Sequence, residues 1–163
     1  MAAASTPAIK VLTGAGIAHR VHAYAHDPRE RSFGEEAVDA LGAELGVSAA
    51  QIFKTLVIEL STGTLAVAVL PVPAKLSLKA AAAALGAPKA SMADKAKAER
   101  TTGYVLGGVS PLGQRKTLPT VIDASALEWD RVLCSAGKRG LEIELAPAEL
   151  VRATGAVTAP ITS

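Results

Sequence analysis

The chain has few aromatic residues and a single cysteine, and both shortages restrict what it can be. Phe, Trp and Tyr make up 3% of its 163 residues, so the core must be built from Ala, Val, Leu and Ile. A platform that stacks the bases of single-stranded nucleic acid needs exposed aromatics and is therefore disfavoured. The lone cysteine, Cys134, excludes an internal disulfide framework and suits a reducing cytosol.

The chain also lacks a strong net charge, a long apolar run and a leader sequence. Its formal charge is +2, so any contact with nucleic acid must come from a local basic patch. No run approaches the roughly 20 apolar residues of a membrane span. Residues 1–7 have neither the basic start nor the apolar stretch of a signal peptide. We therefore expect a cytoplasmic protein with no membrane contact.

Helix and strand patterns are mixed along the chain, with no repeat, linker or shift in composition. We therefore expect a single domain over residues 1–163. The patterns predict helices over 7–16, 33–45, 77–85, 94–101 and 147–154, and strands over 20–24, 52–60, 64–70, 118–122, 132–135 and 141–145. Thr6-Pro7 resembles a helix start, and Ser32 and Glu35 have the spacing of a capping box. The fold class is α+β: a mixed, barrel-like sheet surrounded by helices.

Residues 107–113, Gly-Gly-Val-Ser-Pro-Leu-Gly, are the most unusual segment of the sequence. Three glycines and a proline in seven residues exclude a helix or an ordinary central strand. Glycine lets another molecule approach the backbone closely, and Arg115 and Lys116 follow with charge for an anionic partner. The pattern predicts a loop that holds a ligand.

Lys54 is the best single candidate for chemistry. In a strand it shares one face with Ile52, Leu56 and further apolar residues. A buried ammonium group must meet an anion, shift its pKa or open into a cavity. The alternative is a lysine at the frayed start of the strand that reaches water. The residues alone leave both interpretations open.

Tyr24 is either an amphipathic residue at a strand edge or a phenol that positions a ligand. His22 and His26 flank it with a four-residue spacing. That spacing joins metal ligands on helices rather than on strands, and no third ligand stands nearby, so we expect no metal site.

The chain offers no convincing protein nucleophile. Cys134 alternates within an apolar strand and is expected to be a small buried thiol. Neither Ser110 nor Ser135 has the Gly-x-Ser-x-Gly elbow of a serine hydrolase.

Charged residues near the end of the chain follow strand alternation. Glu142 and Glu144 alternate with apolar residues, which predicts a half-exposed strand with solvated carboxylates. Glu142 is also close enough in sequence to the turn at Lys138 and Arg139 to pair with it. The two basic loop pairs form a predicted phosphate-facing rim: Arg115, Lys116, Lys138 and Arg139.

Together these segments resemble the YbaK branch of the aminoacyl-tRNA deacylases, the family that edits Cys-tRNA(Pro). The resemblance runs nearly end to end and rests on an ordered set of motifs: Thr6-Pro7-Ala8, Tyr24-Ala25-His26-Asp27-Pro28, Phe33-Gly34, Phe53-Lys54-Thr55-Leu56, Leu76-Ser77-Leu78-Lys79, Arg100-Thr101-Thr102-Gly103-Tyr104, the glycine loop, Leu118-Pro119-Thr120-Val121-Ile122-Asp123, and Ser135-Ala136-Gly137-Lys138-Arg139-Gly140-Leu141-Glu142 with the strand that follows. It implies a barrel-like editing domain related to the insertion domain of bacterial prolyl-tRNA synthetases.

The resemblance also assigns roles to particular residues. It places Lys54 near the substrate as a catalytic residue, with Thr55 beside it. It implies pocket positions for Tyr24, Phe33 and Ser135. Its Gly-x-x-x-Pro loop, which holds the aminoacyl ester, corresponds here to Gly107 (the second catalytic assignment), Gly108, Ser110 and Pro111. Glu142 departs from the family, which commonly has Asp there.

The resemblance implies that the substrate supplies the missing nucleophile, because the cysteinyl thiol attacks its own ester carbonyl. It implies mischarged tRNA and prolyl-tRNA synthetase as partners, and no cofactor. Three alternatives stay open: a deacylase of another mischarged tRNA such as Ala-tRNA(Pro), a non-catalytic module that binds tRNA or a synthetase, and a small-molecule binder.

Overall fold

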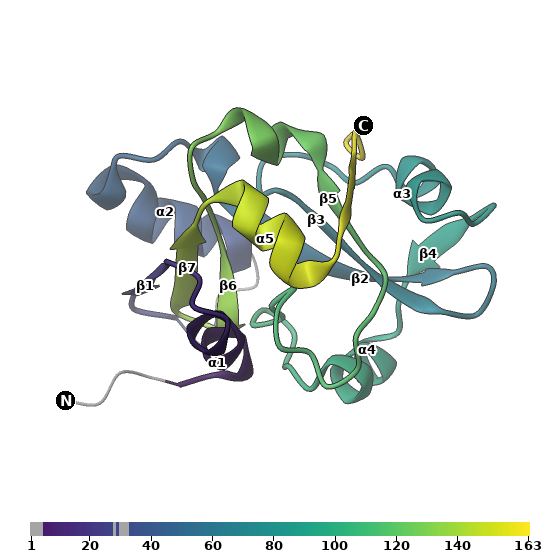
Figure 1. Cartoon of the computed structure of the whole chain (residues 1–163), viewed down its shortest axis with the longest axis horizontal. Coiled ribbons are helices and arrows are strands. Elements are labelled where there is room, and N and C mark those ends of the chain that lie inside the picture. Colours follow the sequence, from purple (N-terminus) through teal and green to yellow (C-terminus); the bar gives the residue numbers. More distant parts are fainter. Residues whose placement is uncertain (1–4, 28, 30–32) are drawn as a thin grey trace.

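Two antiparallel hairpins organise the computed structural model, which describes residues 5–27, 29 and 33–163 (Figure 1). The first hairpin joins β2 (Phe53–Leu60) to β3 (Leu65–Pro71) and lies in a five-stranded sheet of order β4-β2-β3-β5-β8. The second joins β6 (Val132–Lys138) to β7 (Leu141–Leu145) in a three-stranded sheet of order β1-β7-β6. The remaining strands are β1 (Arg20–Ala23), β4 (Ala90–Met92), β5 (Thr120–Asp123) and β8 (Val157–Ala159).

The two sheets meet at a single parallel bridge between Ile52 and Leu133. Strand β5 runs parallel to both of its neighbours, whereas the other pairs are antiparallel, so the larger sheet is mixed. The α+β class with mixed pairing is confirmed. Within the described part of the chain the strands form two sheets and do not close into a barrel, because only this bridge joins them.

The helices begin where the sequence predicts them. They are α1 (Pro7–Gly14), α2 (Phe33–Leu45), α3 (Leu78–Ala84), α4 (Lys95–Thr102) and α5 (Pro147–Thr154), with 3-10 turns η1 (Ala49–Gln51) and η2 (Ala124–Glu128). Side-chain oxygens of Thr6, Ser77 and Asp94 accept hydrogen bonds from first-turn amides, which stabilises three of the starts. The predicted capping box at Ser32 lies outside the described residues. No helix of the described residues has the length and apolarity needed to cross a membrane.

Strand alternation in β6 divides the core around it. Leu133 faces α2, where it packs with Ala37, Leu41 and Ile52. Val132 and Cys134 face the opposite way, toward the cluster that contains residues of α1 and α5. Figure 1 shows α1 and α5 in front of β6 and β7, and α2 behind them. The second hairpin is therefore covered on both faces.

The glycines of the 107–113 loop let the chain approach itself. A Cβ added to Gly108 would lie 3.1 Å from Cα of Lys138, in the turn of the second hairpin. A Cβ on Gly113, where φ is +65°, would overlap the backbone of Pro7 at the start of α1. The close approach that we expected from a ligand is thus made, at these two positions, by the protein's own backbone.

We predict that Gly113→Ala destabilises the fold much more than Gly16→Ala does. Both glycines have a positive φ, +65° and +67°, but an added Cβ at Gly16 meets nothing within 4 Å. The free energy of unfolding of the Gly16 variant should fall by about 1 kcal/mol, because alanine is strained in the left-handed backbone region. That of the Gly113 variant should fall by a further ~1–3 kcal/mol, because the added Cβ overlaps Pro7. Urea unfolding measures both, and equal losses would show that the contact with Pro7 imposes no constraint.

Candidate active site

A cavity of about 180 Å³ lies where α2, the start of β2 and the turn of the second hairpin come together. Its lining gathers seven of the predicted site residues from distant parts of the chain: Tyr24, Phe33, Lys54, Thr55, Gly107, Ser135 and Glu142. Apolar groups complete the wall: Ala37, Ile52, Phe53, Leu56, Val72, Leu106 and Val109, together with the backbone of Gly34. The site is therefore a mostly apolar pocket with a few polar groups that converge on it.

Lys54 supplies the cation of this cavity. Its side chain is half-buried, and Nζ donates a hydrogen bond of 2.7 Å to the carbonyl oxygen of Ala74, in the loop that follows β3. Burial lowers the pKa of Lys54, and the negative charge of Glu35 partly offsets that shift. An ammonium group has three donors, so the bond to Ala74 fixes the head group and leaves other N–H groups to face a ligand.

Two hydroxyl groups line the cavity near Lys54. Thr55 Oγ1 is buried and makes no hydrogen bond with any residue that the structure describes. Ser135 Oγ accepts a 3.1 Å hydrogen bond from the Gly137 amide, at an irregularity in β6, and its own proton stays available. A buried hydroxyl without a partner is costly, so the Thr55 group is suited to a polar atom of a ligand.

Glu142 and Glu144 are buried at 6% exposure each, so the expectation of solvated carboxylates was wrong. Every residue of β7 is buried because helices cover the hairpin on both sides, which alternation along one strand cannot reveal. Glu144 forms 2.6 Å ion pairs with His22 and with Arg131. Glu142 forms no ion pair with Lys138 or Arg139, nor with any other described residue, and it faces the cavity.

Burial favours the protonated form of the Glu142 carboxyl. It raises the pKa of Glu142 to about 8, and none of the described side chains donates a hydrogen bond that would stabilise the charged form. Burial is also the main cause that raises the pKa of Tyr24 to about 12. Tyr24 and the protonated form of Glu142 can therefore both act as O–H donors in the cavity.

Gly107 is enclosed between two side chains at the mouth of the cavity. Its φ is +88°, and an added Cβ would lie 2.7 Å from both Arg139 Nε and a ring carbon of Phe33. The Arg139 guanidinium stacks on the Phe33 ring, with Cζ 4.2 Å from the ring centroid. Only glycine fits this position.

Three predicted loop residues lie outside the cavity lining. Gly108 packs on the turn of the second hairpin. Ser110 is fully buried, and its hydroxyl oxygen accepts from the Leu112 amide. Pro111 borders a separate depression beside α5. These residues shape the loop from behind, and the structure does not place them beside Lys54.

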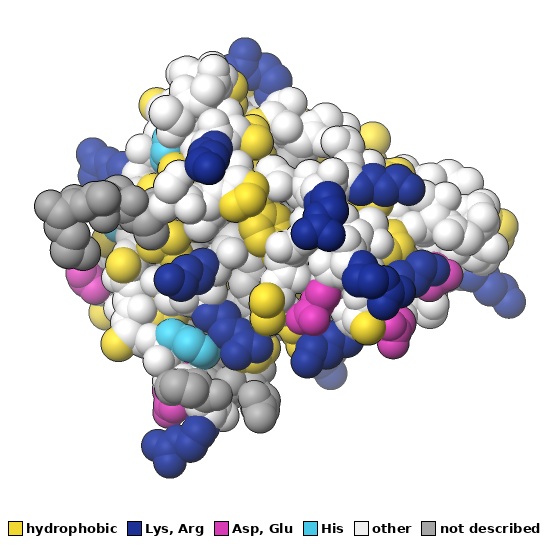
Figure 2. Space-filling model, turned by 90° about the horizontal axis from the view of Figure 1, so that it is seen from below, with side chains coloured by type: hydrophobic (Ala, Val, Ile, Leu, Met, Phe, Trp, Pro, Cys, Tyr) yellow, Lys and Arg dark blue, Asp and Glu magenta, His cyan; other side chains and the backbone are white. Residues whose placement is uncertain are grey.

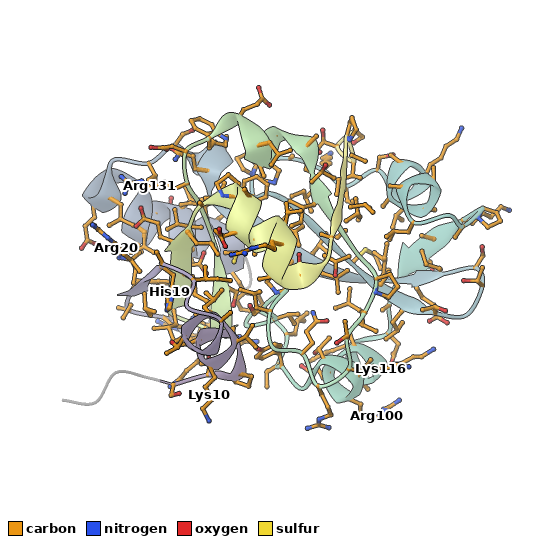
Figure 3. All side chains as sticks on the ribbon, viewed as in Figure 1. Lys10, His19, Arg20, Arg100, Lys116 and Arg131 are labelled. Atoms are coloured by element: carbon orange, nitrogen blue, oxygen red, sulfur yellow. The ribbon has the colours of Figure 1, made fainter. Side chains whose placement is uncertain are left out.

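The predicted basic rim has two locations. Arg115 and Lys116 are exposed beside the end of α4, and Lys138 and Arg139 occupy the turn of the second hairpin. Figure 3 shows Lys116 and Arg100 projecting from the same edge of the molecule. Figure 2 shows lysine and arginine side chains spread over the face that includes α1 and α4. Arg139 differs from the others because its Nε and Nη2 atoms donate hydrogen bonds to the carbonyl oxygen of Leu106.

The remaining candidates form no additional centre. His22 pairs with Glu144 and His26 pairs with Glu36, so the two histidines belong to separate clusters. Among the described residues, no three His, Cys, Asp or Glu side chains lie close enough together to hold a metal ion. Cys134 is fully buried, and burial raises the pKa of its thiol, as expected for an inert core residue.

Sequence reasoning missed most of the apolar wall. Val72 and Leu106 carry no local signal of a ligand site, since they enter it only through tertiary contacts. Gly34 is one exception that the sequence hints at: an added Cβ would lie 2.9 Å from Val72, so a small residue is required there. That Leu106 lines the cavity could be inferred from the sequence only because it directly precedes Gly107.

Comparison with known proteins gives concordant matches. A family model described as the aminoacyl-tRNA editing domain matches residues 34–153. Over 128 residues the chain is 40% identical to EbsC of Enterococcus faecalis, a protein named as a candidate Cys-tRNA(Pro)/Cys-tRNA(Cys) deacylase, and the match covers 78% of this chain and 77% of that protein.

Solved structures agree with this match. The crystal structure of a candidate trans-editing enzyme for prolyl-tRNA synthetase is similar to this fold with a TM-score of 0.82 and 25% identity, and the match covers 99% of each chain. The crystal structure of a hypothetical protein gives a TM-score of 0.82 at 27% identity, and the match covers 97% of this chain and 100% of that one.

We predict that Glu142→Gln changes the dependence of stability on pH. Below pH 4.5, the ordinary pKa, the carboxyl is protonated in the folded and unfolded states alike. As pH rises toward 8, the unfolded chain loses this proton first, so the wild-type protein loses stability up to about 1.4 kcal/mol per pH unit. Glutamine does not titrate, so the variant should gain stability relative to wild type over this interval. Denaturant unfolding from pH 4 to 9 measures the difference, and parallel curves would show that Glu142 titrates normally.

Proposed function

The chain belongs to the aminoacyl-tRNA editing domain family, and we propose that it is a trans-acting deacylase that clears Cys-tRNA(Pro). The observation that carries this proposal is the composition of the cavity. It combines one ammonium group with several neutral O–H donors, and its described lining contains no histidine or cysteine that could serve as a nucleophile or base. A site of this kind can bind and polarise an ester without attacking it.

The electrostatics of the cavity favour negative charge that develops on the substrate. Lys54 contributes a cation whose own carboxylate neighbour, Glu35, is exposed. Burial raises the pKa of Glu142 to about 8, and its protonated form donates a hydrogen bond instead of repelling an anion. The backbone at Gly107 and the hydroxyls of Thr55 and Ser135 add polar groups on the same walls. Donors of this kind stabilise an oxyanion in a water-poor site.

We propose that the substrate provides the nucleophile. The Sγ atom of the esterified cysteine attacks its own carbonyl carbon, a C–S bond forms, and the ester C–O bond to the ribose breaks. The thiol proton passes to the departing ribose oxygen, so the products are a four-membered thiolactone and free tRNA. Water then opens the thiolactone to cysteine. The protein orients the reacting atoms and stabilises the charge.

Lys54 has a particular part in this reaction. A cysteine thiol has a pKa of about 8.5, so only a minor fraction is thiolate at neutral pH. An ammonium group held in place by the Ala74 carbonyl raises that fraction and stabilises the developing oxyanion. The apolar wall restricts the aminoacyl side chain by volume, which explains a preference for a small residue.

We propose that the choice of tRNA comes from a prolyl-tRNA synthetase partner. The solved relative described as a trans-editing enzyme for prolyl-tRNA synthetase supports this, and so does the low net charge of +2. The exposed Arg115, Lys116 and Lys138 then provide weak contacts with the phosphate backbone.

Lys54→Ala should reduce the single-turnover rate of Cys-tRNA(Pro) deacylation by about 100-fold or more, because it removes the cation of the cavity. Lys75→Ala is the matched control, since Lys75 is exposed and does not line the cavity. Cys134→Ala should retain most of the activity, because the thiol is buried away from the cavity. A large loss in the cysteine variant would overturn the substrate-assisted reaction.

Ser-tRNA(Pro) should be released far more slowly than Cys-tRNA(Pro). The two substrates differ by one atom, and a hydroxyl is a much weaker nucleophile than a thiol at neutral pH. Labelled aminoacyl-tRNAs, assayed with and without prolyl-tRNA synthetase, measure both rates. Equal rates would indicate a water molecule or a protein group as the nucleophile instead.

A further inference from the structure

The Arg139 side chain bonds to and stacks on the protein itself, although its position in a basic turn suggested a contact with RNA. Its Nε and Nη2 atoms donate hydrogen bonds of 2.9 and 2.7 Å to the carbonyl oxygen of Leu106. The face of its guanidinium lies over the Phe33 ring. A planar fork that bonds at its edge and stacks on its face is an arrangement that arginine can make and lysine cannot.

The turn that carries Arg139 is itself fixed on several sides. The Gly108 backbone packs against Lys138 and Arg139. A Cβ added to Gly108 would lie 3.1 Å from Lys138 Cα and from Arg139 N. The carbonyl oxygen of Gly140 accepts a 2.9 Å hydrogen bond from the Tyr24 amide. The backbone of Arg139 is therefore a rigid base from which the side chain reaches Leu106.

Arg139 does not line the cavity, but it touches three groups that do. It bonds to Leu106, stacks on Phe33, and lies 2.7 Å from where a Cβ of Gly107 would be. Phe33 is on α2, whereas Leu106 and Gly107 belong to the loop after α4, so Arg139 joins two walls that have no sequence connection.

We propose that Arg139 is a positioning residue, which clamps the segment Leu106–Gly107 against Phe33 and so sets the width of the cavity. The proposal rests on the proposed deacylase function for its effect on selectivity. The clamp holds the Gly107 backbone where the ester carbonyl binds, and it prevents the loop from moving outward to admit larger side chains. Its effect on the reaction passes through Gly107 and Phe33 and not through contact with the substrate.

A phosphate contact at Arg139 would behave differently from a clamp. Loss of a phosphate contact raises KM, leaves kcat and the choice of amino acid unchanged, and matters less at high salt. Loss of a clamp misplaces the reacting groups, which lowers kcat by about 10- to 100-fold, and it has little dependence on salt.

The test compares Arg139→Gln and Arg139→Lys with Lys138→Gln, a change of the exposed neighbouring cation. Deacylation of Cys-tRNA(Pro) is measured at 50 and 300 mM salt, with and without Val-tRNA(Pro), whose larger side chain has no thiol and which therefore acts only as a competitive inhibitor. We expect the glutamine variant to lose kcat about 10-fold or more and to be inhibited more strongly by the valyl ester. The lysine variant should fail to restore either property, because it keeps the charge without the fork. Arg139→Gln behaving as Lys138→Gln, with only a salt-sensitive rise in KM, would overturn the clamp.

Hydrogen exchange tests the clamp without reference to activity. The Gly108 amide donates to the carbonyl oxygen of Val105 at 2.8 Å, so it reports on this loop in the free protein. Its exchange should accelerate about 10-fold in Arg139→Gln and in Phe33→Leu, which removes the stacked ring and keeps the Arg139 guanidinium, and should not change in Lys138→Gln. Unchanged exchange in both clamp variants would overturn the proposal. A wild-type protein that does not deacylate Cys-tRNA(Pro) would overturn the proposed function instead, while the exchange result would still decide the clamp.

Discussion

The contact between Gly107-Gly108 and the turn at Lys138-Arg139 is the constraint on which the site depends. It joins the loop after α4 to the second hairpin closely: an added Cβ would lie 2.7 Å from Arg139 Nε at Gly107 and 3.1 Å from the Lys138 backbone at Gly108. Without this contact the wall formed by Leu106 and Gly107 would have no fixed position relative to Lys54 and Phe33. The carbonyl oxygen of Gly140 in the same turn accepts a hydrogen bond from the Tyr24 amide. One short segment therefore contacts three parts of the cavity wall: Tyr24, Phe33 and the segment Leu106–Gly107.

The second physical feature is the burial of polar groups with few compensating charges. Glu142 has no cation beside it among the described residues, and burial therefore raises the pKa of its carboxyl to about 8. Tyr24 is held as a phenol by the same cause. The cavity consequently presents donors rather than anions, and Lys54 is its one described cation. Glu144, two residues along β7, is equally buried but forms an ion pair with Arg131 and a hydrogen bond with His22. Two carboxylates of one strand thus have opposite electrostatic environments.

Local signals predicted much of this molecule. The helix start at Thr6-Pro7 and the longer strands follow from turn chemistry and periodicity, and the structure confirms them. Lys54 in an apolar row left two interpretations open, and in the structure its half-buried side chain lines the cavity. The short strands β4 and β8 were missed, since three residues give no readable alternation. The solvated state expected for Glu142 and Glu144 was wrong, because it depends on which faces the helices cover.

Sequence alone was enough to identify most of the elements, the membership in an editing family and the residue types available for chemistry. These depend on local backbone preferences and on motifs that are contiguous in the chain. Tertiary contacts were needed to establish which polar groups share the cavity, that Glu142 is buried, and that Arg139 binds the protein's own loop. Those properties depend on burial and on distances between segments more than a hundred residues apart, such as Phe33 and Arg139, which no local pattern encodes.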